Sequence, residues 1–218
     1  MSKANILLND KVEYTKKEFV VDLIIGFTAL ILVAFLFFTS TFWISTVCVQ
    51  QTSMTNTLQE GDVLVLDKLA KVDRGDIIVF KQTENEDYIK RVIAVEGDTV
   101  YTVDGKVWIE YYENGKKVFK QLDEPYLKHP FNGTYLHYSN KVEISRVTIG
   151  KGQYFVLGDN RMNSTDSRTY FNQDGSINTN VNDATYVGLV SEEDVLGVVH
   201  EFWVAKKDVT TKILGKNV

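Results

Sequence analysis

The longest feature of the hydropathy pattern is an apolar stretch near the beginning of the chain. From Leu23 to Gln59 the sequence contains no charged residue, and Leu23–Val47 is its most apolar part. A helix over this part would be about 37 Å long, enough to cross a hydrocarbon core of about 30 Å. A cleaved signal peptide would have a shorter apolar region of about 7–15 residues. The pattern therefore predicts one transmembrane helix over residues 22–47.

The charges that flank this helix predict its orientation. No Lys or Arg follows the apolar stretch until Lys68, whereas four lysines precede it: Lys3, Lys11, Lys16 and Lys17. Cytoplasmic flanks carry the excess of positive charge in membrane proteins. We therefore expect a single-pass protein of the cell membrane, with residues 1–21 in the cytoplasm and the chain from residue 48 onward on the extracytoplasmic face.

After the helix, the pattern changes to short runs of β-branched and aromatic residues, which are typical of strands. Asp104-Gly105 and Asn114-Gly115 lie between such runs and are strong hairpin signals. No stretch shows a sustained apolar period of 3.6 residues, so residues 48–218 are predicted to be all-β. The expected strands are Val63–Leu66, Ile77–Phe80, Tyr88–Val95, Thr99–Val103, Lys106–Tyr112 and Gln153–Leu157.

The soluble part is expected to consist of a core and an inserted lobe. Residues 48–101 and 151–218 form the predicted core, and the hairpin-rich segment 102–150, which carries both prolines, forms the lobe. A second insertion, residues 169–185, is rich in Asn, Asp and Gly and is expected to be an exposed loop.

Composition argues against several classes of function. The net charge of −5 gives no excess of basic residues for binding phosphate groups, so nucleic acid is not an expected partner. The single cysteine, Cys48, cannot form an internal disulfide and is expected to be a small buried apolar residue. None of the three histidines has a metal-binding spacing, so neither a metal nor a cofactor is expected. A Ser-His-Asp triad stays open, because triads form in space rather than in sequence.

One lysine stands out because it lies inside a predicted strand. Side chains alternate along Tyr88–Val95, so one member of the Lys90-Arg91 pair must point toward the core whichever face is buried. A free lysine has a pKa of about 10.4 and is almost fully charged at neutral pH. A desolvated lysine can lose its proton and act as a base. A lysine that extends to solvent from a strand edge is the ordinary alternative.

Two polar segments could supply partners for such a base. Ser53 comes shortly after the predicted membrane exit, and Ser–Lys dyads are an established way to activate a serine. The run Gly158–Arg168 contains four alternating charges, namely Asp159, Arg161, Asp166 and Arg168. Each segment taken alone is typical of a solvated linker or a turn.

Taken together and in order, these segments resemble the type I signal peptidases, or bacterial leader peptidases. The family has a serine box after a membrane helix, a GD-led strand, a KR box followed by GD, a GDNRxxSxDSR box and a Gly-x-Val ending. The matching positions in this sequence are Ser53–Leu58, Gly61–Val65, Tyr88–Asp98, Gly158–Arg168 and Val195–Val198.

The resemblance implies a signal-peptidase/LexA-like β-fold and a role for each matching residue. Ser53 would be the nucleophile, Lys90 the neutral general base, and Ser164 the residue that hydrogen-bonds and orients the Lys90 amine. The implied ion pairs are Asp159 with Arg91 and Asp166 with Arg168. The implied substrate-pocket walls, which favour small side chains at positions −1 and −3 of the signal peptide, are Val49, Met54, Leu58, Tyr88 and Ile89.

Three positions depart from the family pattern. Asn56 replaces the proline of the serine box, so the backbone there is less restricted. Gln51 lies where some members have a serine that completes the oxyanion hole, and Thr52 replaces a common glycine. The Ser53 N–H can still donate, but loss of a second donor can cost about 10²-fold in rate.

We therefore expect a membrane-bound serine endopeptidase that removes signal peptides from exported preproteins by Ser–Lys acyl transfer. Its expected partners are those signal peptides, the lipid bilayer and the secretion translocon. Two alternatives stay open: a divergent Ser–Lys protease for one dedicated exported substrate, such as a pilin-like protein, and an inactive membrane-tethered β-domain. A sortase is disfavoured because Cys48 lies at the membrane exit.

Overall fold

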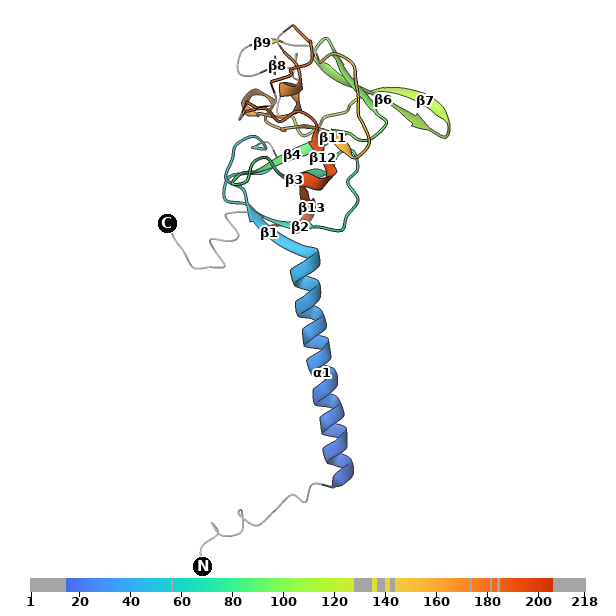
Figure 1. The fold of residues 1–218 in the computed structure, drawn as a ribbon, viewed down its shortest axis with the longest axis vertical. Coiled ribbons are helices and arrows are strands. Elements are labelled where there is room, and N and C mark those ends of the chain that lie inside the picture. The colour runs from blue at the N-terminus through green and yellow to red at the C-terminus, as the bar shows by residue number, and fades with distance from the viewer. Residues whose placement is uncertain are drawn as a thin grey trace, which may run out of the picture. The chain divides into compact units, whose positions relative to one another are not determined.

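The structure is a computed structural model that describes residues 15–55, 57–127, 135–136, 140–141, 144–172, 174–180, 182–183 and 185–205. The chain divides into two compact units, Met1–Phe42 and Trp43–Val218. Figure 1 shows a long helix, α1, and a second unit built largely from strands. The expectation of one apolar helix followed by an all-β domain is confirmed.

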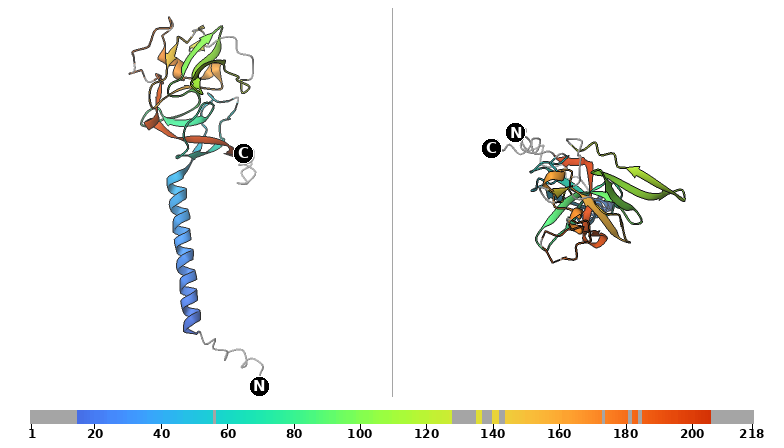
Figure 2. Two further views of the ribbon diagram at one scale, coloured as in Figure 1. Left: turned by 90° about the vertical axis from the view of Figure 1, so that its right-hand side faces the viewer. Right: turned by 90° about the horizontal axis from the view of Figure 1, so that it is seen from above.

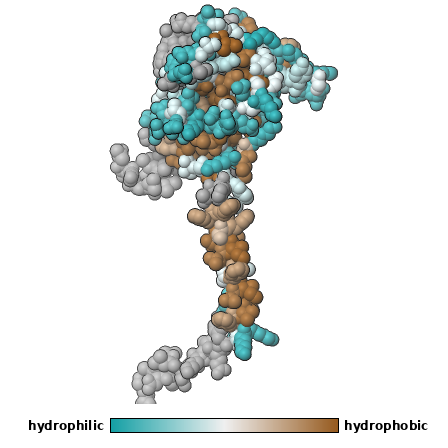
Figure 3. Space-filling view, in the orientation of Figure 1, coloured by the Kyte–Doolittle hydropathy of each residue, from teal (hydrophilic) through white to brown (hydrophobic). Residues whose placement is uncertain are grey.

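Helix α1 extends from Lys16 to Trp43 and is long and apolar enough to cross a membrane. It begins earlier than the predicted residue 22, because Thr15 and Glu18 form a capping box. The Thr15 N–H donates to the Glu18 carboxylate at 2.8 Å, and the Glu18 N–H donates to Thr15 Oγ1 at 3.3 Å. Figure 3 shows the apolar surface of the helix.

The predicted end of the helix at residue 47 was wrong. Residues Ile44–Cys48 form strand β1, which pairs antiparallel with β2, Val63–Asp67. Ile44, Thr46 and Val47 are β-branched and therefore suit a strand better than a helix. Tertiary pairing with β2 thus overrides the continuous apolar pattern of the sequence.

The main sheet has seven strands in the order β1-β2-β13-β3-β4-β11-β12, and its pairings are antiparallel. Strands β2, β3, β4 and β11 match runs expected from the sequence, whereas β1, β12 and β13 were not predicted. The remaining members are β13 (Val195–Ala205), β3 (Ile77–Lys81), β4 (Asp87–Ala94), β11 (Gln153–Leu157) and β12 (Val190–Ser191).

Both faces of this sheet are covered by apolar clusters. One cluster contains Val79 and Ile89, which are cross-strand partners, and the other contains Ile78, the partner of Lys90. As a result Lys90 and Arg91, on opposite faces of β4, are both buried. The alternation in the sequence required only one buried cation, and the two-sided core accounts for the second.

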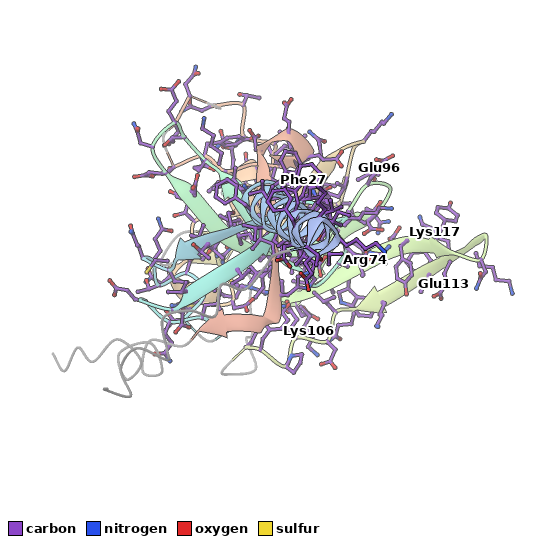
Figure 4. The ribbon with its side chains drawn as sticks, turned by 90° about the horizontal axis from the view of Figure 1, so that it is seen from below. Phe27, Arg74, Glu96, Lys106, Glu113 and Lys117 are labelled. Carbon is purple, nitrogen blue, oxygen red and sulfur yellow. The ribbon has the colours of Figure 1, made fainter. Side chains whose placement is uncertain are left out.

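A smaller sheet, in the order β10-β5-β6-β7, forms the inserted lobe. Residues 104–105 and 114–115 have positive φ values, as type I′ turns require, so both expected hairpins are present. The β6–β7 hairpin projects from the body of this unit (Figures 1 and 2), and the labelled side chains of Glu113 and Lys117 lie near its outer end (Figure 4). The strands are β5 (Thr99–Val103), β6 (Lys106–Glu113), β7 (Lys116–Gln121) and β10 (Val147–Thr148).

The lobe shares an apolar cluster with the core. Val100 and Ile109 of the smaller sheet pack with Ile93 of β4 and Phe155 of β11. The first strand of the lobe's sheet, β5, begins at Thr99, three residues before the expected boundary at 102.

The remaining described elements are short. Strands β8 (Tyr135–Leu136) and β9 (Asn140–Lys141) form a two-stranded sheet. Three 3-10 helices, η3 (Arg161–Asn163), η4 (Ser167–Tyr170) and η5 (Glu192–Asp194), lie between strands. Most described residues of the polar segment 169–185 are exposed or half-buried, but Phe171 is buried in the core cluster.

Candidate active site

The turn that carries Ser53 follows strand β1. The N–H groups of Thr57 and Leu58 both donate to Met54 O, at 2.8 and 2.7 Å, which closes a tight local turn. Val49, Met54 and Leu58 are buried in one apolar cluster and anchor both ends of the turn. Their packing fixes Ser53 at the edge of the main sheet, where it is 7% exposed.

Lys90 extends from β4 to the hydroxyl of Ser53. Lys90 Nζ lies 2.9 Å from Ser53 Oγ and donates a second hydrogen bond to Ile89 O at 3.0 Å. The residue is only 1% exposed. Burial lowers the pKa of the Lys90 ammonium to about 8, because the loss of water disfavours the charged form. The geometry therefore joins a hydroxyl to an amine that is readily deprotonated near neutral pH.

Residues of the segment Gly158–Arg168, called the GDNR segment here, also bind the turn that carries Ser53. The Asn160 N–H donates to Ser53 O at 2.8 Å, and Asn160 Nδ2 donates to Thr52 O at 3.0 Å. Asn163 Nδ2 donates to Thr52 Oγ1 at 2.7 Å. Sequence reasoning did not assign roles to Asn160 and Asn163, although both lie inside the motif that carries the resemblance.

Gly158 allows this close approach because it has no side chain. A Cβ atom at Gly158 would lie 2.2 Å from Ser164 Oγ and 2.7 Å from Ser53 O. Both distances are far below van der Waals contact. The glycine that opens the motif thus lets the backbone of Ser53 pack against the segment that carries Ser164.

The Ser164 hydroxyl is bound to a buried carboxylate. Ser164 Oγ donates to Asp166 Oδ2 at 2.7 Å, and the Gly158 N–H donates to the same oxygen at 3.0 Å. Among the hydrogen bonds of the described residues, Lys90 Nζ bonds Ser53 and Ile89 but not Ser164. The expected Ser164–Lys90 hydrogen bond is therefore not made in this structure, because the hydroxyl is directed to Asp166.

Asp166 is itself paired with Arg168. Arg168 Nε donates to Asp166 Oδ1 at 2.7 Å and Nη2 donates to Oδ2 at 2.9 Å, in a fork that suits a carboxylate. Burial by itself would raise the pKa of Asp166, but the Arg168 guanidinium and the hydrogen bonds from Gly158 and Ser164 outweigh it. The pKa of this carboxyl therefore lies below its ordinary value.

Asp159 and Arg91 form a second buried fork. Arg91 Nε and Nη2 donate to the two oxygens of Asp159 at 2.9 and 2.7 Å, and Arg91 Nη1 donates to Gly75 O. The guanidinium also stacks 4.1 Å from the ring of Tyr126, and Thr57 Oγ1 donates to Asp159. These contacts join β4, the turn that carries Ser53 and the GDNR segment.

The inserted lobe contributes to this network. Glu124 binds the buried Arg161, which also donates to Gly158 O at 3.1 Å. Tyr126 lies next to Glu124 and donates its hydroxyl to that carboxylate at 2.9 Å. Neither Glu124 nor Tyr126 was expected at the site, because they lie in segment 102–150 and no sequence motif marks them.

Comparison with known proteins places this arrangement in a family. The family model described as "Signal peptidase, peptidase S26" matches residues 20–204. The chain belongs to this family. It is therefore a serine endopeptidase that removes signal peptides from preproteins, and its apolar helix is consistent with a membrane anchor.

Two relatives of similar sequence agree with the family assignment, and one solved structure is also similar to this chain. Signal peptidase IB of Staphylococcus aureus strain COL is 30% identical over 200 residues, which cover 85% of this chain and 88% of the relative. Signal peptidase I of Bacillus caldolyticus is 37% identical over 139 residues, which cover 59% of this chain and 71% of the relative. A crystal structure of a signal peptidase I from Enterococcus faecalis is 28% identical, covers 60% of this chain and 98% of that chain, and has a TM-score of 0.39.

Within this signal peptidase, a cavity of about 420 Å³ opens beside Ser53. Three of the expected pocket residues, Val49, Met54 and Ile89, line it. Leu58 and Tyr88 are not among the residues that line the cavity: Leu58 is buried in the same apolar cluster, and the ring of Tyr88 lies 4.8 Å from Lys90 Nζ. The other lining residues are Val47, Cys48, Gln50, Gln51, Ser53, Asn85, Glu86 and Asp87.

Two features of the serine region bear on the departures from the family pattern. Gln51 lines the cavity next to Ser53, and within the described part of the chain the Ser53 N–H donates no hydrogen bond. Asn56 lies outside the described residues. The expectation that Cys48 is buried was wrong, because its side chain is exposed at the cavity wall.

Proposed function

We propose that Ser53 and Lys90 form the catalytic dyad of this signal peptidase. The observation that carries the proposal is the 2.9 Å hydrogen bond between Ser53 Oγ and Lys90 Nζ inside an apolar setting. A lysine is a useful base only when its amine is neutral, and burial lowers its pKa to about 8. A neutral amine accepts the Ser53 proton through its lone pair.

The proposed acylation step begins when neutral Lys90 takes the proton of Ser53 as Oγ attacks the scissile carbonyl carbon. The Ser53 N–H donates to the oxyanion of the tetrahedral intermediate. Collapse of the intermediate breaks the C–N bond, and the Lys90 ammonium gives its proton to the leaving amine. The products of this step are the mature chain with a free N-terminus and a signal peptide esterified to Ser53.

In the proposed deacylation step, Lys90 deprotonates a water molecule that attacks the ester carbonyl. Collapse of the second intermediate returns the proton from Lys90 to Ser53 Oγ and releases the signal peptide as a carboxylate. We assign Ser164 and the ion pairs Asp159–Arg91 and Asp166–Arg168 to holding the two reacting groups, since they join the serine turn to β4 and to the GDNR segment. Such positioning is worth several kcal/mol of a reaction barrier.

We further propose that the N-terminus lies in the cytoplasm and the catalytic unit on the extracytoplasmic face. The lysines before the apolar helix, and the absence of Lys or Arg between it and Lys68, support this orientation. The bilayer around α1 and the secretion translocon would then be the partners of the enzyme. Tethering to one membrane face raises the effective concentration of membrane-bound signal peptides.

The dyad is tested by processing of an exported preprotein by the full-length enzyme in detergent. Ser53→Ala and Lys90→Ala should each lower the rate by more than about 10³-fold, and Lys90→Arg should not restore it because arginine stays protonated. Ser145→Ala and Lys68→Ala remove an exposed hydroxyl and an exposed amine elsewhere and should retain full activity. Wild-type rates in both alanine variants of the dyad would refute the assignment.

A further inference from the structure

The cavity beside Ser53 has walls of two different kinds. Val49, Met54 and Ile89 line it with buried apolar side chains, called the apolar base here. Asn85, Glu86 and Asp87 also line it; they belong to the turn between β3 and β4 and the beginning of β4, and they are all exposed. Asn85, Glu86 and Asp87 are called the acidic rim here.

The backbone fixes where the acidic rim lies relative to the nucleophile. Gln82 and Thr83 both donate their N–H groups to Glu86 O, at 2.9 and 3.1 Å, so the turn is closed immediately before β4. Asp87 and Ile89 are two residues apart on the same face of β4, which corresponds to about 7 Å along a strand. An extended peptide that runs along β4 with its −1 side chain over Ile89 would bring side chains two to four residues from the scissile bond beside the rim carboxylates.

The rim carboxylates are not neutralised by the described part of the protein. Lys81 stands opposite Asp87 in the β3–β4 ladder, yet none of the ion pairs among the described residues includes Glu86 or Asp87. Two carboxylates that form no ion pair within the described residues thus line a cavity whose proposed occupant is a peptide. Such charges attract a cationic side chain and repel an anionic one.

We propose that Glu86 and Asp87 are specificity-determining residues that favour a Lys or Arg side chain two to four residues from the scissile bond. The apolar base of the cavity then selects size next to the cleaved bond, and the acidic rim selects charge further along the peptide. This proposal rests on the proposed function, because it requires that the peptide reacts with Ser53 in this cavity.

The test compares kcat/KM for a set of signal-peptide substrates processed by the full-length enzyme in detergent. Each substrate carries Lys, Gln or Glu at one position from −5 to +4, with the small residues at −1 and −3 kept. At one or more positions within the proposed range, the wild type should have a kcat/KM about two- to thirtyfold higher for the Lys substrate than for the Glu substrate, since an exposed ion pair is worth about 0.2–1 kcal/mol and a like-charge contact costs a similar amount. The preference should fall when ionic strength rises.

Variants of the acidic rim separate the proposal from general charge effects. Glu86→Gln with Asp87→Asn should remove the Lys preference at those positions, so that the Lys, Gln and Glu substrates have similar kcat/KM values in this variant. Glu84→Gln is the matched control, because Glu84 is exposed in the same turn but does not line the cavity. Lys81→Gln should increase the Lys preference, because it removes the cation opposite Asp87.

The outcomes distinguish the two proposals. A charge preference that disappears in the rim variants and persists in Glu84→Gln supports the inference. An enzyme that depends on Ser53 and Lys90 but shows the same charge preference with and without the rim carboxylates overturns the inference and leaves the dyad intact. Processing that does not depend on Ser53 overturns both.

Discussion

Lys90 Nζ meets Ser53 Oγ at 2.9 Å although the two residues are 37 positions apart in the chain. The contact is possible because Ser53 follows β1 at one end of the main sheet, Lys90 lies within β4, and both residues are buried. The amine is shielded from water, and its pKa lies near 8. This pair links the core packing of the domain to its chemistry.

The pH dependence of activity follows from the pKa of Lys90. Because the base must be neutral and burial lowers its pKa to about 8, kcat/KM should rise with pH and reach a plateau above this value. At pH 6 the rate should be about 100-fold below the plateau, since only about one amine in a hundred is then neutral. A pH–rate profile measured with subsaturating preprotein checks this. A profile that is flat from pH 6 to 9 would contradict a lysine base.

The buried Lys90 should also lower the stability of the fold at neutral pH. Its pKa falls from 10.5 to about 8 on folding, so protonated Lys90 costs up to about 3 kcal/mol below pH 8. As the pH rises from 8 to 10.5, the unfolded chain holds more protons than the folded one, and this cost disappears. Lys90→Met should therefore be inactive but more stable at pH 7 than the wild type.

The measurement for Lys90→Met is denaturant unfolding in detergent at pH 7 and at pH 10. The advantage of the variant should be largest at pH 7 and should shrink at pH 10, where the wild-type amine is neutral. Ser53→Ala serves as the control, because it also removes activity but keeps the buried amine. A Lys90→Met variant less stable than the wild type at pH 7 would show that the buried amine does not destabilise the fold.

Asp166 should be needed both for stability and for the position of the active-site groups. Asp166→Asn leaves the buried Arg168 guanidinium without its carboxylate partner, and breaking such a pair typically costs about 3–5 kcal/mol. Because Asp166 also raises the pKa of Lys90, the acid limb of the pH–rate profile should move to lower pH in this variant. Denaturant unfolding and the pH profile give the two readouts, and a variant with wild-type stability would exclude the structural role.

The acid side of the stability curve provides a further check on the same carboxylate. The pKa of Asp166 is lower in the folded chain than in the unfolded chain, so its contribution is present above its unfolded pKa and is lost as the pH falls through its folded pKa. Asp166→Asn should remove this part of the acid dependence. An Asp174→Asn variant changes an exposed carboxylate in a polar loop and should keep nearly all of the wild-type stability at neutral pH.

Gly158→Ala should displace Ser53 although it removes no hydrogen-bonding group. The new Cβ would lie 2.2 Å from Ser164 Oγ and 2.7 Å from Ser53 O, so the two segments must separate. We expect a destabilisation of about 1–3 kcal/mol, as for other overpacked sites, and a loss of kcat of about 10²-fold because small misplacements at a reacting group are costly. Gly26→Ala in α1, where nothing lies within 4 Å, is the control. A Gly158→Ala enzyme with wild-type kcat would show that separation of the Ser53 and Ser164 segments does not impair catalysis.

The sequence alone determined the class of the fold and the identity of the family. Runs of β-branched and aromatic residues and the Asp-Gly and Asn-Gly turns set out β2 to β6 and β11, because strand propensity and type I′ turn chemistry are local properties of the chain. The ordered motifs around Ser53, Lys90 and Gly158–Arg168 led to the signal peptidase family. The apolar helix was recognised from its length, but not its end, since Ile44–Cys48 joins a sheet only through its partner β2.

Only the tertiary structure decided which groups meet and what their surroundings are. Local alternation could not indicate that both faces of β4 are covered, and this is what buries Lys90 and Arg91 together. It could not bring Glu124 and Tyr126 of the lobe to Arg161 and Arg91, direct Ser164 to Asp166, or line the cavity with the acidic rim. These features depend on contacts between distant segments, and a pKa or a hydrogen bond is set by the groups that folding brings near rather than by neighbours in sequence.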